Sequence, residues 1–379
     1  MRETVIVEAV RTPVGKRNGV LRDTRPDELL AMVLKELTKR AKLDPIHVED
    51  VIAGCVTQTS EQSNDIARLA ALIAGFPITV PGVTLDRQCG SSLQAIHFGS
   101  QAIMSGDMDI VIACGVESMS RVPMFSNIQG AQHSKQLTAQ YDIIHQGVSA
   151  ERIADLWRFS REDLDRFSLS SHQKAVRAIK EGRFDREIMA IHTENGPITT
   201  DEGPREDTSM EKLAALTPPF VKNGKITAGN ASQLSDGAAA VLLMSREKAE
   251  ELGLKPRFRI LARTVVGSDP TLMLTGPVAA TEKALKKAQL NLEDIDLFEI
   301  NEAFASVPLH WLKETGANPD NLNVNGGAIA LGHPLGATGA RIMTTLTHEL
   351  ERQNKKFGLM AICEGFGMAN ATIIEKLTS

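Results

Sequence analysis

Cys89 is the residue whose setting most suggests chemistry. It lies in the polar run from Leu85 to Ser92, directly before a stretch, Leu93 to Met104, with the apolar spacing of a buried helix. Unpaired backbone N–H groups and the dipole at a helix start favour a thiolate, and a free cysteine titrates near ~8.5. The placement predicts covalent catalysis; the alternative is a buried structural cysteine. A thiol nucleophile would also need a histidine, a second proton carrier and an oxyanion site.

His333 is the first candidate partner. It precedes Pro334 in the run from Asn325 to Gly339, which contains five glycines. Glycines let the backbone pass close to another group, and the absence of Gly-Lys-Ser/Thr excludes a phosphate-binding loop. His333 is therefore a plausible general base for a thiol, and the alternative is an ordinary turn between a strand and a helix.

Cys363 and Asn301 each follow or end a predicted strand. Cys363 precedes Glu364 and Gly365 at the end of an apolar run, where a thiol can carry a proton and glycine N–H groups can form an oxyanion hole. The alternative for Cys363 is core packing. Asn301 follows the strand predicted at 297–300 and can hold a water or polarise a carbonyl, or else cap the following helix.

Composition excludes several classes of protein. The chain of 379 residues is 42% hydrophobic and 23% charged, with net charge −5, one Tyr and two Trp. That balance disfavours a nucleic-acid binder, and no apolar run approaches the ~18 residues that span a bilayer. The four cysteines form no CxxC pair for zinc. We expect free thiols in a reducing cytoplasm, with Cys55 and Cys114 in the core.

Short β-branched runs alternate with helical periods, which predicts α/β layers with partly parallel sheets. The expected strands are 5–8, 50–53, 110–114, 239–244, 258–266, 297–300, 323–324, 359–363 and 371–376. The expected helices are 26–42, 64–74, 90–105, 161–181, 246–252, 280–288 and 337–353. Ser160 with Asp163 predicts a capping box, and Gly182 the end of that helix.

The order of elements repeats in the two ends of the chain, which predicts two similar halves with Cys89 and His333 at related loop-to-helix junctions facing one cleft. The intervening residues are richer in Gln, His, Pro and Asp. We expect residues 1–120 and 246–257 to form an N-terminal half with a connecting segment, and 258–379 a C-terminal half. Residues 121–245 are expected to form an inserted loop domain that covers the cleft and returns to the N-terminal half.

Taken together, these segments resemble the thiolase family of acetyl-CoA C-acyltransferases. The similar stretches occur in family order and cover nearly the whole chain. They are Glu8–Gly15, Asp86–Ser91, Gly115–Ser120, Thr227–Ser232, Asn301–Phe304, Gly326–Pro334 and Cys363–Gly365.

The resemblance implies a thiolase fold: five layers, α/β/α/β/α, from two similar halves plus an inserted loop domain. It implies that Cys89 is the acylated nucleophile, that His333 activates it, and that Cys363 is the acid/base for the CoA thiol or the α-carbon of acetyl-CoA. Asn301, through a bound water, and His333 would stabilise the thioester oxyanion at one stage. The backbone N–H groups of Cys89 and Gly365 would do so at the other.

The resemblance also assigns a substrate and CoA site to His145, Arg205, Phe220, Ala228 and Ser232. Arg205 would face the nucleotide and Ser232 the pantetheine amide, although Arg205 is also interpretable as an exposed loop charge and Ser232 as a helix cap. No cofactor or metal is implied, because CoA is a co-substrate. The implied partners are acyl-CoA and CoA, with no nucleic acid or membrane, and the implied assembly is a homodimer or homotetramer.

The implied reaction is ping-pong acyl transfer: cleavage of 3-ketoacyl-CoA by CoA to acetyl-CoA and a shortened acyl-CoA, or the reverse Claisen condensation. Alternatives are a short-chain biosynthetic acetoacetyl-CoA-forming acetyltransferase and a catalytically silent CoA-binding homologue. Three departures bear on this choice. Phe366 replaces the usual middle glycine of Cys-x-Gly-Gly-Gly. Gln146 replaces a Met that limits acyl length in short-chain members. The segment 121–144 is shorter than in biosynthetic members of the family. We therefore expect a pocket wider than acetoacetyl.

Overall fold

A mixed β-sheet runs through the computed structural model, which describes residues 2–194 and 196–378. The first half of the sheet contains β1 (Thr4–Arg11), β2 (Gly15–Lys16), β3 (Asp50–Gly54), β4 (Gly82–Leu85), β5 (Ile110–Ser118) and β8 (Ser235–Ser245). The second half contains β9 (Phe258–Gly267), β10 (Leu297–Ile300), β11 (Phe357–Glu364) and β12 (Met368–Lys376). Two residue pairs at one end of β1 and β9 join these halves.

The two halves share one strand topology. In the first, β3 pairs parallel with β5, and β8 lies antiparallel between β5 and β1. In the second, β10 pairs parallel with β11, and β12 lies antiparallel between β11 and β9. The internal duplication expected from the sequence is therefore confirmed.

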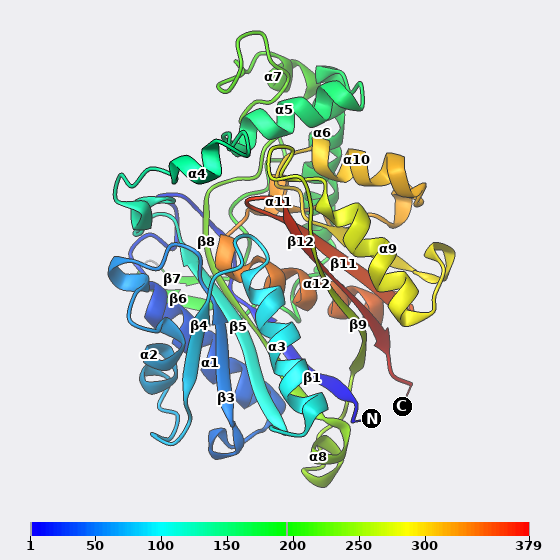
Figure 1. Ribbon diagram of the computed structural model, residues 1–379. Coiled ribbons are helices and arrows are strands. Elements are labelled where there is room, and N and C mark those ends of the chain that lie inside the picture. The colour runs from blue at the N-terminus through cyan, green and yellow to red at the C-terminus, as the bar shows by residue number, and fades with distance from the viewer. Residues whose placement is uncertain (1, 195, 379) are drawn as a thin grey trace.

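Helices and sheet halves alternate in five layers. On the outer face of the first half lie α1 (Pro26–Ala41) and α2 (Ile66–Ile73), and outside the second half lie α9 (Gly276–Ala288) and α10 (Ser306–Thr315). Between the halves lie α3 (Ser91–Ser105) and α12 (Thr338–Arg352), whose apolar side chains share one core with both halves (Figure 1). The α/β/α/β/α order is as expected.

The two central helices cross closely. A Cβ atom added at Gly339 of α12 would collide with the backbone nitrogen of Leu93 in α3. Ser92 Oγ also accepts a hydrogen bond from the Ala340 N–H at 2.9 Å. The N-terminal ends of both helices are thereby held beside each other, and the Cys89 and His333 loops lead into these ends.

The chain between β5 and β8 forms further helices at one end of the molecule (Figure 1). They are α4 (Lys135–Thr138), α5 (Gln146–Leu156), α6 (Arg161–Lys180) and α7 (Met210–Ala214). The same chain also forms a hairpin of β6 (Ile191–Thr193) and β7 (Gly196–Ile198), which packs against the core beside α1. The capping box of Ser160 and Asp163 begins α6, and Gly182 follows its end at φ +66°. The division of the chain into domains stays a prediction.

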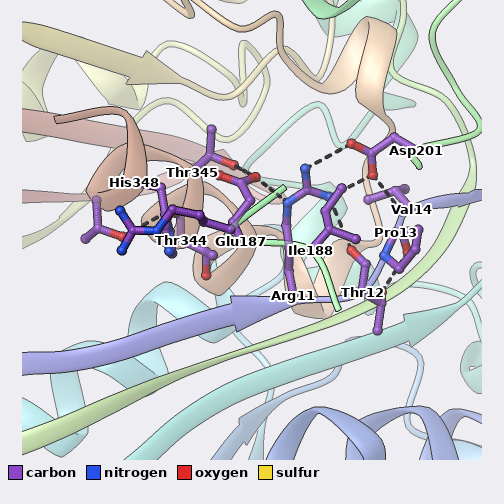
Figure 2. Close-up of polar contacts among 12 residues, drawn as sticks. Arg11, Thr12, Pro13, Val14, Glu187, Ile188, Asp201, Thr344, Thr345 and His348 are labelled. Atoms are coloured by element: carbon purple, nitrogen blue, oxygen red, sulfur yellow. Dashed lines mark hydrogen bonds and ion pairs between the residues drawn. The ribbon is translucent and has the colours of Figure 1, made fainter. Parts of the chain in front are cut away.

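A buried ionic network ties this connecting chain to both halves (Figure 2). The Arg11 guanidinium of β1 donates to Glu187 Oε1 at 2.6 Å and to both oxygens of Asp201 at 2.7 and 2.9 Å. Thr345 of α12 donates to the same Glu187 oxygen at 2.9 Å. One arginine thus links the first strand, the connecting chain and a central helix of the second half.

Several local expectations differ from the structure. The strand expected at 323–324 is wrong: Leu322 makes one isolated bridge to Phe298, and Asn323 instead uses its side chain to bond the β10 backbone. The sequence did not predict β4, α5 or α10. The remaining elements are α8 (Arg246–Glu251), α11 (Ala328–Leu331) and the 3-10 turns at Pro45–His47, Ser60–Gln62, Ser126–Ile128, Leu292–Asp294, Pro319–Asn321 and Leu335–Ala337. Among the residues described, no helix is both long and apolar enough to cross a membrane.

Candidate active site

A cavity of about 360 Å³ collects residues from both halves and from the connecting chain. It lies beside the ends of β4 and β5 in the first half of the sheet and of β10 and β11 in the second. Within each half the parallel strands bring their carboxyl ends to one edge, the usual ligand position in α/β sheets. Of the ten residues assigned to catalysis or binding from the sequence, seven line it: Cys89, His145, Phe220, Ala228, Ser232, His333 and Gly365.

Cys89 lies in the loop between β4 and α3. The loop is closed by Ser91 Oγ, which accepts from the Arg87 N–H at 2.9 Å and donates to the Gln88 carbonyl at 2.6 Å. Burial raises the pKa of the Cys89 thiol well above its usual range, and negative charge on Cys363 or Glu364 would raise it further. The expectation that the helix start favours a thiolate is therefore wrong here. Burial outweighs the dipole, and α3 begins two residues later.

His333 has a defined tautomer. Its Nδ1 lies 2.7 Å from Thr338 Oγ1, and the Thr338 hydroxyl donates its single proton to the Pro334 carbonyl at 2.9 Å. Thr338 can therefore accept but not donate toward the imidazole, so Nδ1 carries the hydrogen and Nε2 presents a lone pair. Burial lowers the pKa of His333 to about 3, with Arg341 adding to the shift, which keeps the imidazole neutral.

Asn301 directs its amide at the same nitrogen. Its Nδ2 lies 3.5 Å from His333 Nε2, and its buried Oδ1 has no partner among the described residues. The alternative role as a helix cap is wrong, because α10 begins at Ser306 with Ala305 before it. The Asn301 amide, and His333 once its Nε2 has taken a proton, can donate N–H groups to a carbonyl oxygen.

Cys363 lies at the end of β11, fully buried among apolar side chains that include Leu274 and Phe304. Burial raises the pKa of its thiol to about 12, and the charge of Glu364 adds to this shift. Gly365 follows at the cavity wall. Cys363 and Asn301 do not line the cavity. At neutral pH the cavity therefore holds one protonated thiol, that of Cys89, and a neutral imidazole, and the protonated Cys363 thiol is buried close to Cys89.

Two buried carboxylates that the sequence analysis did not single out position the site loops. Glu117 of β5 accepts from the Val56, Thr57 and Gly336 N–H groups at 2.9–3.0 Å. Glu302 accepts from Ile329 N at 3.2 Å and from Ser171 Oγ at 2.7 Å. Such groups carry no spacing signal in the sequence.

A second cavity of about 260 Å³ adjoins the first at Cys89. It shares Cys89, Met124, Gln146, Leu335 and Gly365 with the first. Phe366 forms part of its wall, with φ at +64° and an edge-to-face contact to His133 at 5.7 Å between ring centroids.

The residues that the resemblance assigned to CoA divide between neighbouring cavities. His145 accepts from the Gly147 N–H at 3.1 Å through Nδ1, and its ring stacks on Phe220 at 5.0 Å between centroids. Arg205 does not line the Cys89 cavity. It lines an adjoining cavity of about 200 Å³ with His172 and Ala228, and Ala228 also lines the first. The described residues include no group of three or more His, Cys, Asp or Glu side chains that could hold a metal.

Comparison with known proteins gives consistent matches over the whole chain. The family models for the thiolase N-terminal and C-terminal domains match residues 4–247 and 254–376. The chain is 50% identical to "Steroid 3-ketoacyl-CoA thiolase FadA6" of Mycobacterium tuberculosis, over 100% of this chain and 95% of that protein. It is 47% identical to "3-ketoacyl-CoA thiolase" of Aliivibrio fischeri, over 99% and 100%.

A solved structure shows the same fold. The crystal structure of the Bacillus anthracis acetyl-CoA acetyltransferase superposes with a TM-score of 0.91 at 42% identity, covering 100% of this chain and 99% of that one.

Proposed function

The chain belongs to the thiolase family of acyltransferases, and we propose that it cleaves 3-ketoacyl-CoA with CoA to give acetyl-CoA and a shortened acyl-CoA, or runs the reverse condensation. The observation that carries the proposal is the placement of His333. His333, whose Nε2 carries no hydrogen, and the Cys89 thiol face one cavity, with the thiol of Cys363 buried close to Cys89.

In the first half-reaction, Cys89 Sγ attacks the 3-keto carbon while its proton passes to His333 Nε2. The thiol pKa is raised and the imidazole pKa is lowered, so a free thiolate–imidazolium pair is disfavoured. Proton transfer is therefore coupled to attack, when the negative charge reaches the substrate oxygen. The carbon–carbon bond then breaks, Cys363 supplies a proton to the acetyl-CoA carbanion, and the acyl group stays on Cys89.

In the second half-reaction, Cys363 takes the proton of the incoming CoA thiol, which attacks the acyl-Cys89 carbonyl. The bond between the acyl carbon and Cys89 Sγ then breaks, and Cys89 recovers its proton from His333 Nε2. Asn301 and His333 stabilise the oxyanion of one thioester and the Cys89 and Gly365 N–H groups that of the other. CoA serves as a co-substrate, and the residues present supply nucleophile, base and acid without a further cofactor.

Initial-rate kinetics of CoA-dependent thiolysis test this function. Varying CoA at several fixed 3-ketoacyl-CoA concentrations should give parallel double-reciprocal lines, and Cys89→Ala should abolish turnover. Intersecting lines would contradict a covalent intermediate, and absence of cleavage would favour a silent CoA binder.

We place the CoA chain between Phe220, Ala228 and Ser232, with its nucleotide near Arg205. The adjoining cavities that share Ala228 support this path, because together they lead from Cys89 toward a cationic mouth. Arg205→Ala should raise the KM for CoA with less effect on kcat.

The acyl tail is assigned to the second cavity, behind Cys89. Its volume exceeds the need of an acetyl group, which supports acyl groups longer than acetoacetyl and disfavours the strictly short-chain alternative. Rates of thiolysis across a 3-ketoacyl-CoA length series test this assignment, with condensation measured alongside. Phe366→Gly should shift the preference toward bulkier tails, while strict preference for acetoacetyl-CoA would refute the wide pocket.

A homodimer is the assembly we favour. One edge of the sheet ends at β4, beside exposed apolar side chains of Leu72, Ile73, Ile78, Val83 and Phe98. An unpaired edge with apolar side chains favours pairing with another strand. Val83→Lys should lower the sedimenting mass to that of one chain, whereas Leu156→Lys, at an exposed site elsewhere, should not.

The four unpaired thiols fit a reducing cytoplasm.

A further inference from the structure

Four buried polar atoms lie behind Cys89 without a hydrogen-bond partner in the described chain. They are Arg87 Nε, both carboxyl oxygens of Glu364, and Asn370 Oδ1. Glu364 and Asn370 are completely buried. Buried polar atoms are normally paired, so a cluster of unpaired ones beside a nucleophile requires an explanation.

Gly90 brings the cluster against the Cys89 loop. A Cβ atom at position 90 would collide with Glu364 Oε1 and would lie 2.7 Å from Asn370 Nδ2. Asn370 Nδ2 donates to the Gly90 carbonyl at 3.0 Å. The carboxyl group of Glu364 therefore packs against Gly90, the residue that follows Cys89. Glu364 also follows Cys363 directly in strand β11.

The charged groups that act on Glu364 come from the loop between β4 and α3. Burial raises the pKa of Glu364 to about 8; Arg87 opposes this shift and Asp86 adds to it. Cys89 and Cys363 complete the surroundings, and an ionised Glu364 raises the pKa of both thiols.

A structural ion pair does not account for this carboxyl. Neither carboxyl oxygen of Glu364 has a hydrogen-bond partner among the described residues, and Arg87 acts on Glu364 through its charge alone. Burying an unpaired carboxylate is costly, so the neutral acid is the favoured form around neutral pH. Perturbed carboxyls of this kind gather at functional sites.

We propose that Glu364 is a positioning residue that sets the ionisation of Cys89 and Cys363: as a neutral acid it lets either thiol carry negative charge, and as a carboxylate it opposes that charge. This inference rests on the proposed function, which makes these two thiols the reacting groups. It predicts that the reactivity of Cys89 rises less with pH than that of an isolated thiol once Glu364 ionises.

Alkylation of Cys89 by iodoacetamide without substrate provides the test, with the modified residue identified by mass spectrometry. Below its pKa a thiol gains reactivity about tenfold per pH unit. In the wild-type protein the slope should fall below this value between about pH 7 and 9, as Glu364 ionises. Glu364→Gln should restore the full slope. The ratio of variant to wild-type rates should therefore rise from near one at about pH 6.5 to about threefold to tenfold at about pH 9.5.

Glu293→Gln, the same change at an exposed position, should keep the wild-type profile. A rate ratio for Glu364→Gln that does not change with pH would overturn the role of Glu364. A full slope in the wild-type protein would overturn it as well, even if the variant does not fold. Alkylation of a cysteine other than Cys89 would instead count against the proposed function.

Discussion

At the scale of single residues, His333 shows how the fold makes a base from an ordinary side chain. The Thr338 hydroxyl donates its proton to the Pro334 carbonyl, which fixes the imidazole tautomer and leaves the lone pair of Nε2 unprotonated. The same burial that lowers the pKa of His333 raises that of Cys89. The resting enzyme therefore does not form a Cys89 thiolate with a His333 imidazolium, and negative charge develops on the substrate oxygen during attack.

Replacement of Thr338 tests this orientation. Thr338→Val removes the acceptor for Nδ1–H, so the imidazole can rotate or change tautomer, and kcat/KM for thiolysis should fall by about tenfold to a hundredfold. Thr338→Ser keeps the hydroxyl and should restore most of the activity.

Thr347→Val is the matched control on the same helix, because the Thr347 hydroxyl bonds only backbone carbonyls of α12. Equal losses in Thr338→Val and Thr347→Val would mean that helix packing, and not the tautomer, sets the rate.

The sequence identified the chemistry-bearing residues better than their supports. Cys89, His333 and Gly365 could be found in the sequence because they lie beside glycines at predicted strand or helix ends. The structure brings them to one cavity. Thr338 and Glu117 were missed as supports. The partners of Glu117 are distant backbone N–H groups that leave no local pattern, whereas Thr338 lies only four and five residues from its partners Pro334 and His333. The helix-start argument for Cys89 failed because burial is a property of the whole fold.

At the scale of elements, the central helices carry buried histidines that make stability depend on pH. Burial lowers the pKa of His97 in α3 and of His348 in α12 to about 3. The unfolded chain takes up protons near ~6.5. Stability from each neutral histidine is therefore complete above about pH 6.5 and is lost as the pH falls toward 3.

His97→Gln should make the protein less sensitive to acid. By about pH 5, a histidine of this kind removes about 2 kcal/mol from the free energy of unfolding. The variant should lose correspondingly less between about pH 7 and 5 in urea unfolding. Its absolute stability at pH 7 is a separate packing effect.

The exposed His47 gives the control. His47→Gln should retain the wild-type dependence, and an unchanged slope in His97→Gln would refute the account of buried neutral histidines.

Most elements were predictable because their periodicity and caps are local. The Ser160–Asp163 capping box was confirmed in full. The edge strand β4 was missed because its four residues are short and partly exposed, and α10 because its first turn follows the Asn301 motif without a capping side chain. The strand expected at 323–324 is wrong because Asn323 satisfies β10 with side-chain atoms.

At the scale of the whole molecule, the site exists only where two similar halves meet. Cys89 comes from the first half and His333, Asn301 and Cys363 from the second, while the connecting chain closes the cavity. Repetition of element order predicted this convergence, but the ties that hold it are long-range ion pairs such as that of Arg11, which no local pattern encodes.

Arg11→Met tests the principal tie of the connecting chain. It leaves the carboxylates of Glu187 and Asp201 buried without their partner, so the free energy of unfolding should fall by about 3–5 kcal/mol. Arg166→Met breaks an exposed pair with Glu162 and should cost about 1 kcal/mol or less. Similar losses in the two variants would show that the buried network does not hold the molecule together.

Mass spectrometry of the intact protein after incubation with acetyl-CoA tests directly whether Cys89 carries the acyl group. Acyl transfer through Cys89 predicts an acetyl adduct that peptide mapping places on Cys89, that disappears on addition of CoA, and that is absent from Cys89→Ala. An adduct on another residue, or no adduct in active wild-type enzyme, would contradict acyl transfer through Cys89.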